Sequence, residues 1–385
     1  MHPIVELTVD GEPVAGAFYE RLISLSVVDK EGVASDTFEA TLNDGPPNFL
    51  ALPRKGAIVV PKLGYRNTGT REMGRFTVDQ VNAKCLPYSL AINGKAADLR
   101  SGKLKEHSER HFEDKSLGEI VEEIAGEAGL SARVAPVLGA HHYEWIAQES
   151  ETPIHFLERL ARRHNALFTV KDGNLIFAER GAGLTASGAP MGAITVTPDM
   201  VITGTLSFEF NDRSTFGTVV AYYQDREKAE RVEIEVEGDP EGDAVYRLPE
   251  PFADPAEAEK AAESKAKQLK RGEGSASVTL PGDTAIAAGV PLVFRGIRPG
   301  LDGVPWVIET ATHTYSKRAG YRTAVDLKLY DGDSGAESAA ANDGAAASGG
   351  EAAGGQEGTP SADTPAPDAP PNAPPAPRWW GGERM

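Results

Sequence analysis

Apolar and polar residues alternate along much of the first hundred positions of the chain. Residues 23–27 and 37–42 both place an apolar side chain at every second position. A period of two is typical of a strand with one buried face. Turn signals such as Asp10-Gly11 and Asn93-Gly94 separate these runs. We therefore expect residues 1–98 to form a first β-barrel region.

The pattern changes to a helical period after Leu99. Ser116 and Glu119 form a capping box, which predicts a helix near residues 116–128. Thr152 followed by Pro153 is a typical helix start, and it predicts a second helix near residues 152–165. A tight β-hairpin around Asp172-Gly173 follows. Residues 99–192 are therefore predicted to be a small α/β insertion.

Strand patterns return from residue 193 to residue 331, which we expect to form a second β-barrel region. Asp254 and Pro255 predict one interrupting helix, near residues 255–271. In one strand, the carboxylates alternate with valine and isoleucine, so one face of this strand is predicted to be acidic. We expect Glu233, Glu235 and Glu237 on this face either to contact a partner or to face the lumen of an assembly.

The net charge of the chain bears on which kinds of partner it can bind. The 385 residues carry a formal net charge of −18. Nucleic acid is therefore not expected as a partner, because binding to phosphates requires a basic surface. The single cysteine, Cys85, excludes an internal disulfide and is expected to be a buried structural thiol.

The composition changes again after Tyr330. Residues 332–385 are rich in alanine, glycine and proline and contain eight acids and two bases. Such a segment cannot bury enough apolar surface to offset its ordering entropy, so we expect a disordered tail. Trp379 and Trp380 near its end are candidate partner contacts, because tryptophan is favoured at interfaces.

The sequence shows neither a secretory signal nor a run of about 20 apolar residues that could span a membrane. We expect synthesis in the cytoplasm and no membrane insertion by the chain itself.

Several patterns suggest chemistry but do not support a site. Residues 332–335 read Gly-Asp-Ser-Gly, as in a serine protease loop, but they lie in the predicted tail. His107 and His111 are four residues apart, yet the charged segment around them is typical of a solvated surface. His141, His142 and Glu144 lack a metal-binding spacing.

The remaining candidates have structural interpretations. His313 alternates with apolar neighbours and is expected to pack or form hydrogen bonds within a strand. No pair of carboxylates has the apolar surroundings that would raise a pKa for glycoside hydrolysis. We therefore predict no catalytic residue, no metal and no cofactor, and a protein that is not an enzyme.

An ordered set of short motifs nevertheless resembles a known family. These motifs are Gly74–Asp79, Ala96–Arg100, Ser116–Val121, Phe156–Ala161, Asn174–Phe177, His313–Tyr315 and Gly320–Thr323. Together they span most of residues 1–331 and resemble the late control protein D family, the baseplate hub proteins of contractile phage tails. The resemblance does not extend to the tail.

The resemblance implies a mainly β (α+β) fold, with two tube-like β-barrels flanking the insertion. It implies a homotrimer that forms a pseudo-sixfold ring between the hexameric tail tube and the trimeric spike. The expected partners are a second and third copy, the spike protein and the tail tube protein, with the tape measure protein as a further candidate. The expected location is the tail baseplate of the virion, after assembly in the host cytoplasm.

Three alternatives stay open from the sequence. One is a peptidoglycan hydrolase associated with the tail. Another is a hub of a type VI secretion system or another contractile injection system, which shares the implied fold. The third is a two-domain binding module that need not form a ring. The identity of the spike and the exchange of strands between the two barrels are also left open.

Overall fold

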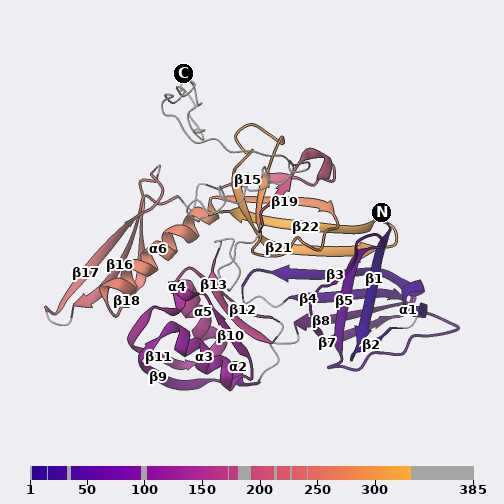
Figure 1. Cartoon of the computed structure of the whole chain (residues 1–385), viewed down its shortest axis with the longest axis horizontal. Helices are drawn as coiled ribbons and strands as arrows, with labels where there is room; N and C mark the ends of the chain where they lie inside the picture. Colours follow the sequence, from indigo (N-terminus) through magenta and orange to yellow (C-terminus); the bar gives the residue numbers. More distant parts are fainter. Residues whose placement is uncertain are drawn as a thin grey trace, which may run out of the picture.

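Most of the chain folds into β-strands, which confirms the predicted mainly β class (Figure 1). The computed structural model describes residues 2–14, 16–32, 36–96, 102–171, 173–180, 192–211, 215–225, 228–240 and 242–330. The side chain of Ala17 is also outside this description. Within these ranges, no helix is both long and apolar enough to cross a membrane.

The N-terminal part of the chain forms half of a large sheet. Its elements are β1 (Pro3–Val9), β2 (Glu12–Pro13), α1 (Gly16–Arg21), β3 (Leu22–Lys30), β4 (Thr37–Asn43), β5 (Ile58–Tyr65), β6 (Gly69–Glu72), β7 (Phe76–Lys84) and β8 (Ser89–Ala96). We call strands β1–β8 the N-terminal half-sheet. Its strands curl around a buried core that includes Leu25, Phe38 and Phe76.

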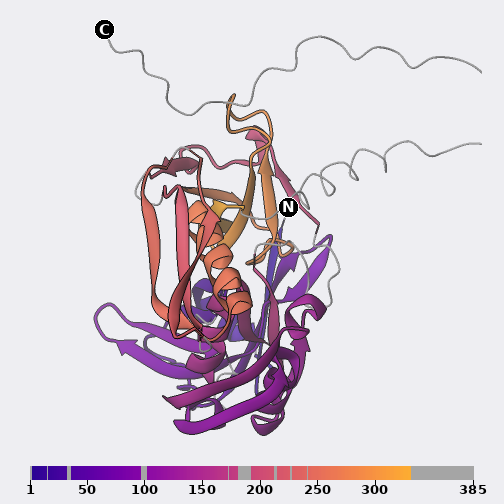
Figure 2. The same ribbon diagram turned by 90° about the vertical axis from the view of Figure 1, so that its left-hand side faces the viewer.

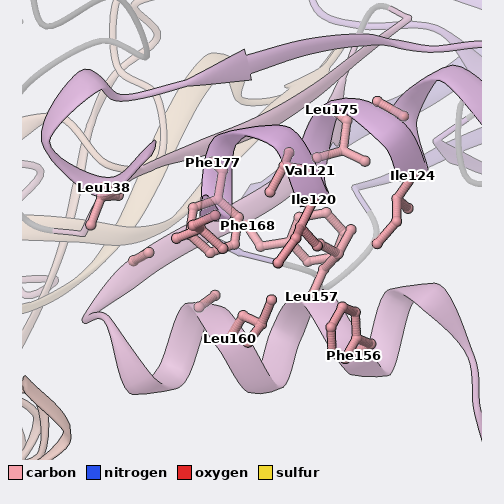
Figure 3. Close-up of a cluster of buried hydrophobic side chains, with 14 of the residues drawn as sticks. Ile120, Val121, Ile124, Leu138, Phe156, Leu157, Leu160, Phe168, Leu175 and Phe177 are labelled. Atoms are coloured by element: carbon pink, nitrogen blue, oxygen red, sulfur yellow. The ribbon is translucent and has the colours of Figure 1, made fainter. Parts of the chain in front are cut away.

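The middle of the chain forms a separate unit, here the insertion unit. It contains α2 (Gly102–Lys105), β9 (Ser108–Ser116), α3 (Leu117–Glu127), β10 (Ser131–Val134), α4 (Pro136–Gly139), β11 (His142–Glu151), α5 (Pro153–Arg163), β12 (Ala166–Lys171) and β13 (Asn174–Glu179). The strands form two small sheets, β11-β9 and β10-β13-β12. The helices pack between them on a shared apolar core (Figure 3).

Local sequence accounts for the two long helices of this unit. The Ser116 hydroxyl accepts from the Glu119 backbone N–H at 3.2 Å, and the Glu119 carboxylate accepts from the Ser116 N–H at 2.8 Å. Thr152 caps α5 by accepting from the His155 N–H at 3.3 Å. Both predicted helices are thus confirmed. Burial of a side chain such as Phe156 contributes about 2 kcal/mol relative to its exposure.

The C-terminal part contains the other half of the large sheet and an additional unit. Its elements are β14 (Ile194–Val196), η2 (Pro198–Met200), β15 (Ser207–Phe210), β16 (Thr218–Asp225), β17 (Glu230–Glu237), β18 (Val245–Phe252), α6 (Pro255–Gly272), β19 (Gly274–Pro281), β20 (Pro291–Phe294), β21 (Pro305–Ser316) and β22 (Gly320–Leu329). We call β14, β15 and β19–β22 the C-terminal half-sheet. It has a core of its own, which includes Phe294 and Trp306.

The two half-sheets form a single hydrogen-bonded sheet of 14 strands. Its main path runs β15-β19-β22-β21-β3-β4-β8-β7-β5-β1-β2. The halves meet where β3 pairs with β21 in antiparallel register, with Val27 opposite His313 (Figure 1). The strand at the centre of the sheet therefore comes from the beginning of the chain and pairs with one near its end.

Strands β16–β18 and helix α6 form a smaller unit, which we call the outer unit. The sheet order is β17-β16-β18, and α6 covers one face of it. Figure 2 shows α6 lying along these strands. The region predicted as a second barrel with one helix therefore contains two sheets. Val219 packs against α6 in the outer unit, whereas Phe208 packs on the core of the C-terminal half-sheet.

The prediction that Cys85 is buried was wrong. Cys85 is exposed and free, because it lies in the turn between β7 and β8 rather than inside a strand. Burial was predicted because apolar residues flank Cys85 in the sequence. These neighbours do not indicate burial here, since Leu86 is itself 82% exposed.

Candidate functional site

The open face of the outer unit carries the predicted row of carboxylates. Glu233, Glu235 and Glu237 lie at alternate positions of β17, and all three side chains are exposed. Ile234 and Val236 point the other way, toward α6. The strand therefore presents an acidic surface, as its alternation predicts.

Two arginines on the same face neutralise part of this acidic row. Arg247 of β18 donates to Glu233 at 2.7 Å, and Arg231 of β17 lies 3.3 Å from the same carboxylate. The hydrogen bond from Arg247 lowers the pKa of Glu233, so that carboxylate stays ionised. No ion pair of Glu235 or Glu237 is found among the residues that the structure describes. Among the described residues, Glu235 and Glu237 are therefore the carboxylates of this row whose charge no ion pair neutralises.

The same sheet also presents strand edges. Within the described part of the chain, β17 and β18 each pair only with β16, which lies between them. An outer strand carries a row of backbone N–H and C=O groups that another strand can pair with. Charged side chains on such an edge select among partners and fix their register.

A cluster of charges lies where the two half-sheets meet the insertion unit. Lys171, at the end of β12, forms ion pairs with Asp29 of β3 and with Asp36, the latter at 3.1 Å. The second Asp29 oxygen accepts from the Ala288 backbone N–H at 2.9 Å. Three segments that are distant in sequence therefore meet at Asp29. We call Asp29, Asp36 and Lys171 the junction cluster.

The junction cluster borders a cavity of about 280 Å³, which Arg71, Met73 and Ile286 also line. Burial lowers the pKa of Lys171, but the carboxylates of Asp29 and Asp36 outweigh burial and raise it. Lysine therefore stays charged at this position. Burial raises the pKa of Asp36, against the opposing effect of Lys171. Each charged group in the cluster stabilises the ionised form of its opposite partner. The cluster therefore has a structural role, because it links the half-sheets to the insertion unit.

His313 occupies a structural position beside the junction cluster. It is buried in β21, its Nε2–H donates to the Ile286 carbonyl at 3.0 Å, and its Nδ1 accepts from the Tyr321 hydroxyl at 2.9 Å. Burial lowers the pKa of this imidazole, which therefore stays neutral. The prediction that His313 packs and forms hydrogen bonds within a strand is confirmed.

A cluster of aromatic and imidazole rings lies near the contact of α5 with α6, and the sequence patterns gave no sign of it. The Tyr143 hydroxyl and Nε2 of His164 are hydrogen-bonded at 2.5 Å, and the ring centroids of His141 and His164 are 4.5 Å apart. Burial, together with the charge of His141, lowers the pKa of His164 to about 3. Arg163 next to it forms an ion pair with Glu257, which is 4% exposed, in the first turn of α6. This contact joins the insertion unit to the outer unit.

The other histidines do not converge. His107 and His111 are exposed, as predicted for a solvated surface, and His142 lies 3.2 Å from Asp114. Among the described residues, no group of three or more His, Cys, Asp or Glu side chains is arranged to hold a metal ion. The Gly-Asp-Ser-Gly sequence and the Trp379-Trp380 pair lie outside the described residues.

Residues 68–319 match the family model described as phage tail baseplate hub (GPD). The matched range begins in the N-terminal half-sheet, includes both the insertion unit and the outer unit, and ends between β21 and β22.

Individual relatives agree with this match. The chain is 29% identical over 377 residues to the "Probable baseplate hub protein" of Escherichia phage 186, covering 87% of this chain and 96% of that protein. The 43 kDa tail protein of prophage MuSo2 from Shewanella oneidensis has a similar fold, with a TM-score of 0.66, 16% identity, and coverage of 86% of this chain and 99% of that one.

A more distant likeness, with a TM-score of 0.50 and 11% identity, links the fold to the E. coli c3393 protein, a component of the type VI secretion system. It covers 84% of this chain and 76% of that protein.

Proposed function

We propose, from the premise that the chain belongs to the phage tail baseplate hub (GPD) family, that three copies form a ring joining the tail tube to the spike. The family places the protein in the baseplate of a phage-type tail as a structural component. We add three points to what family membership implies: the chain forms a trimer, the trimer has pseudo-sixfold symmetry, and it contacts the tail tube and the spike.

The observation that carries the proposal is the division of one sheet into two half-sheets. Each half has its own buried core, and antiparallel pairing of β3 with β21 joins them. Three copies would present six such halves, which matches a tube of six subunits. The same three copies would match a threefold spike on the other side. A single chain of this design can therefore bridge the two symmetries.

The contacts between copies would use strand edges and charged faces. Among the described strands, β15 is at one end of the main path of the large sheet and β2 at the other. Head-to-tail contacts that close into a ring bring unlike surfaces together, so each copy needs two different edges. We assign the acidic face of β17 to such a contact, either with a neighbouring copy or with the spike.

The alternative functions have less support. A peptidoglycan hydrolase requires a carboxylate or metal site, and the described residues provide no group arranged for metal binding. The type VI component shares the fold at 11% identity, and this level of likeness concerns the fold alone. The carboxylates of Asp29, Asp36 and Glu257, which are buried or half-buried, each pair with a lysine or arginine of the fold.

The test is the native mass of the assembly isolated from the producing strain through an N-terminal tag. Three copies bound to three copies of a second protein would support the hub ring and identify the spike. The same preparation is assayed for loss of turbidity of a peptidoglycan suspension. A monomer that clears peptidoglycan would contradict the proposal and favour the hydrolase.

A further inference from the structure

A basic groove lies between the insertion unit and the outer unit. It has a volume of about 250 Å³ and lies between α5, β18 and α6. Leu248, Phe252 and Ala261 give it an apolar floor, and Arg159, Arg162, Arg163 and Lys265 line its rim. One carboxylate, Glu250, is among the lining residues. The groove therefore favours an occupant that is both acidic and apolar.

Two of these four cations form no ion pair with a carboxylate among the described residues. Arg159 pairs with Glu151 at 2.5 Å, and Arg163 pairs with Glu257. Arg162 is exposed, and no ion pair to it is found in the described ranges. Lys265 lies 4.6 Å from the centre of the Tyr246 ring and donates to the Gln268 side chain at 3.0 Å. Both groups can pair with an added carboxylate without breaking an ion pair of the fold.

The chain itself carries a segment of matching chemistry. Residues 359–377 contain eight prolines, two aspartates (Asp363 and Asp368) and no lysine or arginine. Proline-rich segments favour an extended conformation that loses little entropy on binding and lies well in grooves lined by aromatic rings. Two aromatic rings line the groove, and of these Tyr246 is partly exposed while Phe252 is buried in its floor.

The origin of this segment also fits. Ser275, just after the end of α6, pairs with Lys328 near the end of β22, so the chain leaves the described structure beside the C-terminal end of α6. Helix α6 rises about 1.5 Å per residue, which places Ser264 in the groove about 12 Å from that end. The residues between Tyr330 and Thr359 can span on the order of 90 Å when extended. The chain between Tyr330 and Thr359 is therefore long enough for segment 359–377 to reach the groove.

We propose that the proline-rich acidic segment 359–377 of the same chain docks in this groove, with Asp363 and Asp368 pairing with Arg162 and Lys265. Docking would cover the contact between the insertion unit and the outer unit and hold the end of the chain at a fixed place on the hub. This inference does not depend on the trimer or on the spike.

The experiment uses the full-length chain and a carbodiimide, which joins a lysine amine to a touching carboxylate with loss of water. We expect a cross-link between Lys265 and Asp363 or Asp368, identified by mass spectrometry of the proteolytic peptides. Arg162→Glu should lower its yield about tenfold, because repulsion replaces an ion pair. The Asp363→Asn, Asp368→Asn double variant should abolish it. The Lys115–Glu123 pair is the internal standard for the reagent.

The matched control is Lys267→Glu, which reverses a charge on the exposed side of the same helix and lines no part of the groove. It should leave the cross-link at Lys265 unchanged. The proposal is overturned if the tail aspartates couple to Lys267 or Lys270 as often as to Lys265 in the parent chain. It is also overturned if mixing chains labelled with ¹⁴N and ¹⁵N yields mainly mixed cross-links, since the occupant would then be the tail of another copy.

Discussion

Lys171 links the insertion unit to Asp29, the residue at which three segments of the chain meet. Its ammonium group lies between Asp29 and Asp36, and Asp29 also holds the backbone of Ala288. A half-buried ion pair adds little net stability to the fold, because desolvation of the two charges offsets their attraction. Removing one partner is nevertheless destabilising, because the remaining charge is left buried and unpaired. The cluster therefore matters most when one member is removed.

We predict that Lys171→Ala lowers the free energy of unfolding by about 1–3 kcal/mol, because two carboxylates would face each other without a cation. Urea unfolding followed by intrinsic fluorescence measures this change. Lys84→Ala, at an exposed position, is the control and should change the free energy by less than about 0.5 kcal/mol. Equal effects of the two variants would contradict the structural role of the cluster.

His164 predicts a dependence of stability on pH. Its pKa is lowered from 6.5 to about 3 by burial and by His141. As the pH falls below 6.5, the unfolded chain takes up this proton before the folded chain does, so stability is lost between pH 6.5 and about 3. His164→Gln should reduce the difference between the free energies of unfolding at pH 7 and pH 4.5.

The control for this pH series is His107→Gln, because His107 is exposed and hydrogen-bonds only to the Ser150 carbonyl in the described structure. This variant should keep the pH dependence of the parent chain. If His164→Gln also keeps it, the protonation of His164 is not linked to unfolding.

At the scale of elements, helix starts followed directly from sequence. The caps of α3 and α5 rest on residues three positions apart, so the signal is local and can be read without knowing the fold. The same holds for the hairpin of β12 and β13, where Gly173 has a φ of 73° as its turn requires. These elements were predicted with nearly correct bounds.

Pairing between distant elements could not be predicted in this way. Val27 pairs across from His313, and Lys171 reaches Asp29 over 142 positions of sequence. Nothing in the local pattern of either segment specifies its partner. The groove between α5 and α6 and the cluster around His164 depend on such pairings, and both were missed for the same reason. The acidic face of β17 was found because alternation along one strand is sufficient to define it.

For the element α5, we predict that Thr152→Ala destabilises the protein by about 1 kcal/mol, because the His155 N–H loses its acceptor. Thr152→Ser keeps the hydroxyl and should retain most of that stability. Thermal unfolding of the three proteins under identical conditions measures the difference. Equal midpoints for the alanine and serine variants would show that the cap contributes nothing.

At the scale of the whole molecule, charge reversal on β17 tests whether its acidic face is a contact surface in the assembly. Reversing the charges at Glu233, Glu235 and Glu237 should reduce the yield of the complete ring or of its complex with the spike, measured by native mass spectrometry. The matched control reverses three exposed acids of the insertion unit, Glu109, Glu144 and Glu149. Normal assembly of the β17 variant, with the isolated chain still folded, would place that face outside the contacts.

The β3–β21 pair has a consequence for how the protein is made on the ribosome. β3 is complete at Lys30, but its partner begins at Pro305. At translation rates of about 5–20 residues per second, the backbone groups on one edge of β3 stay without their partner strand β21 for on the order of half a minute. A nascent chain that terminates early would leave this edge open to pairing with other chains. The central pair can therefore form only in a chain that extends through β21, which ends at Ser316.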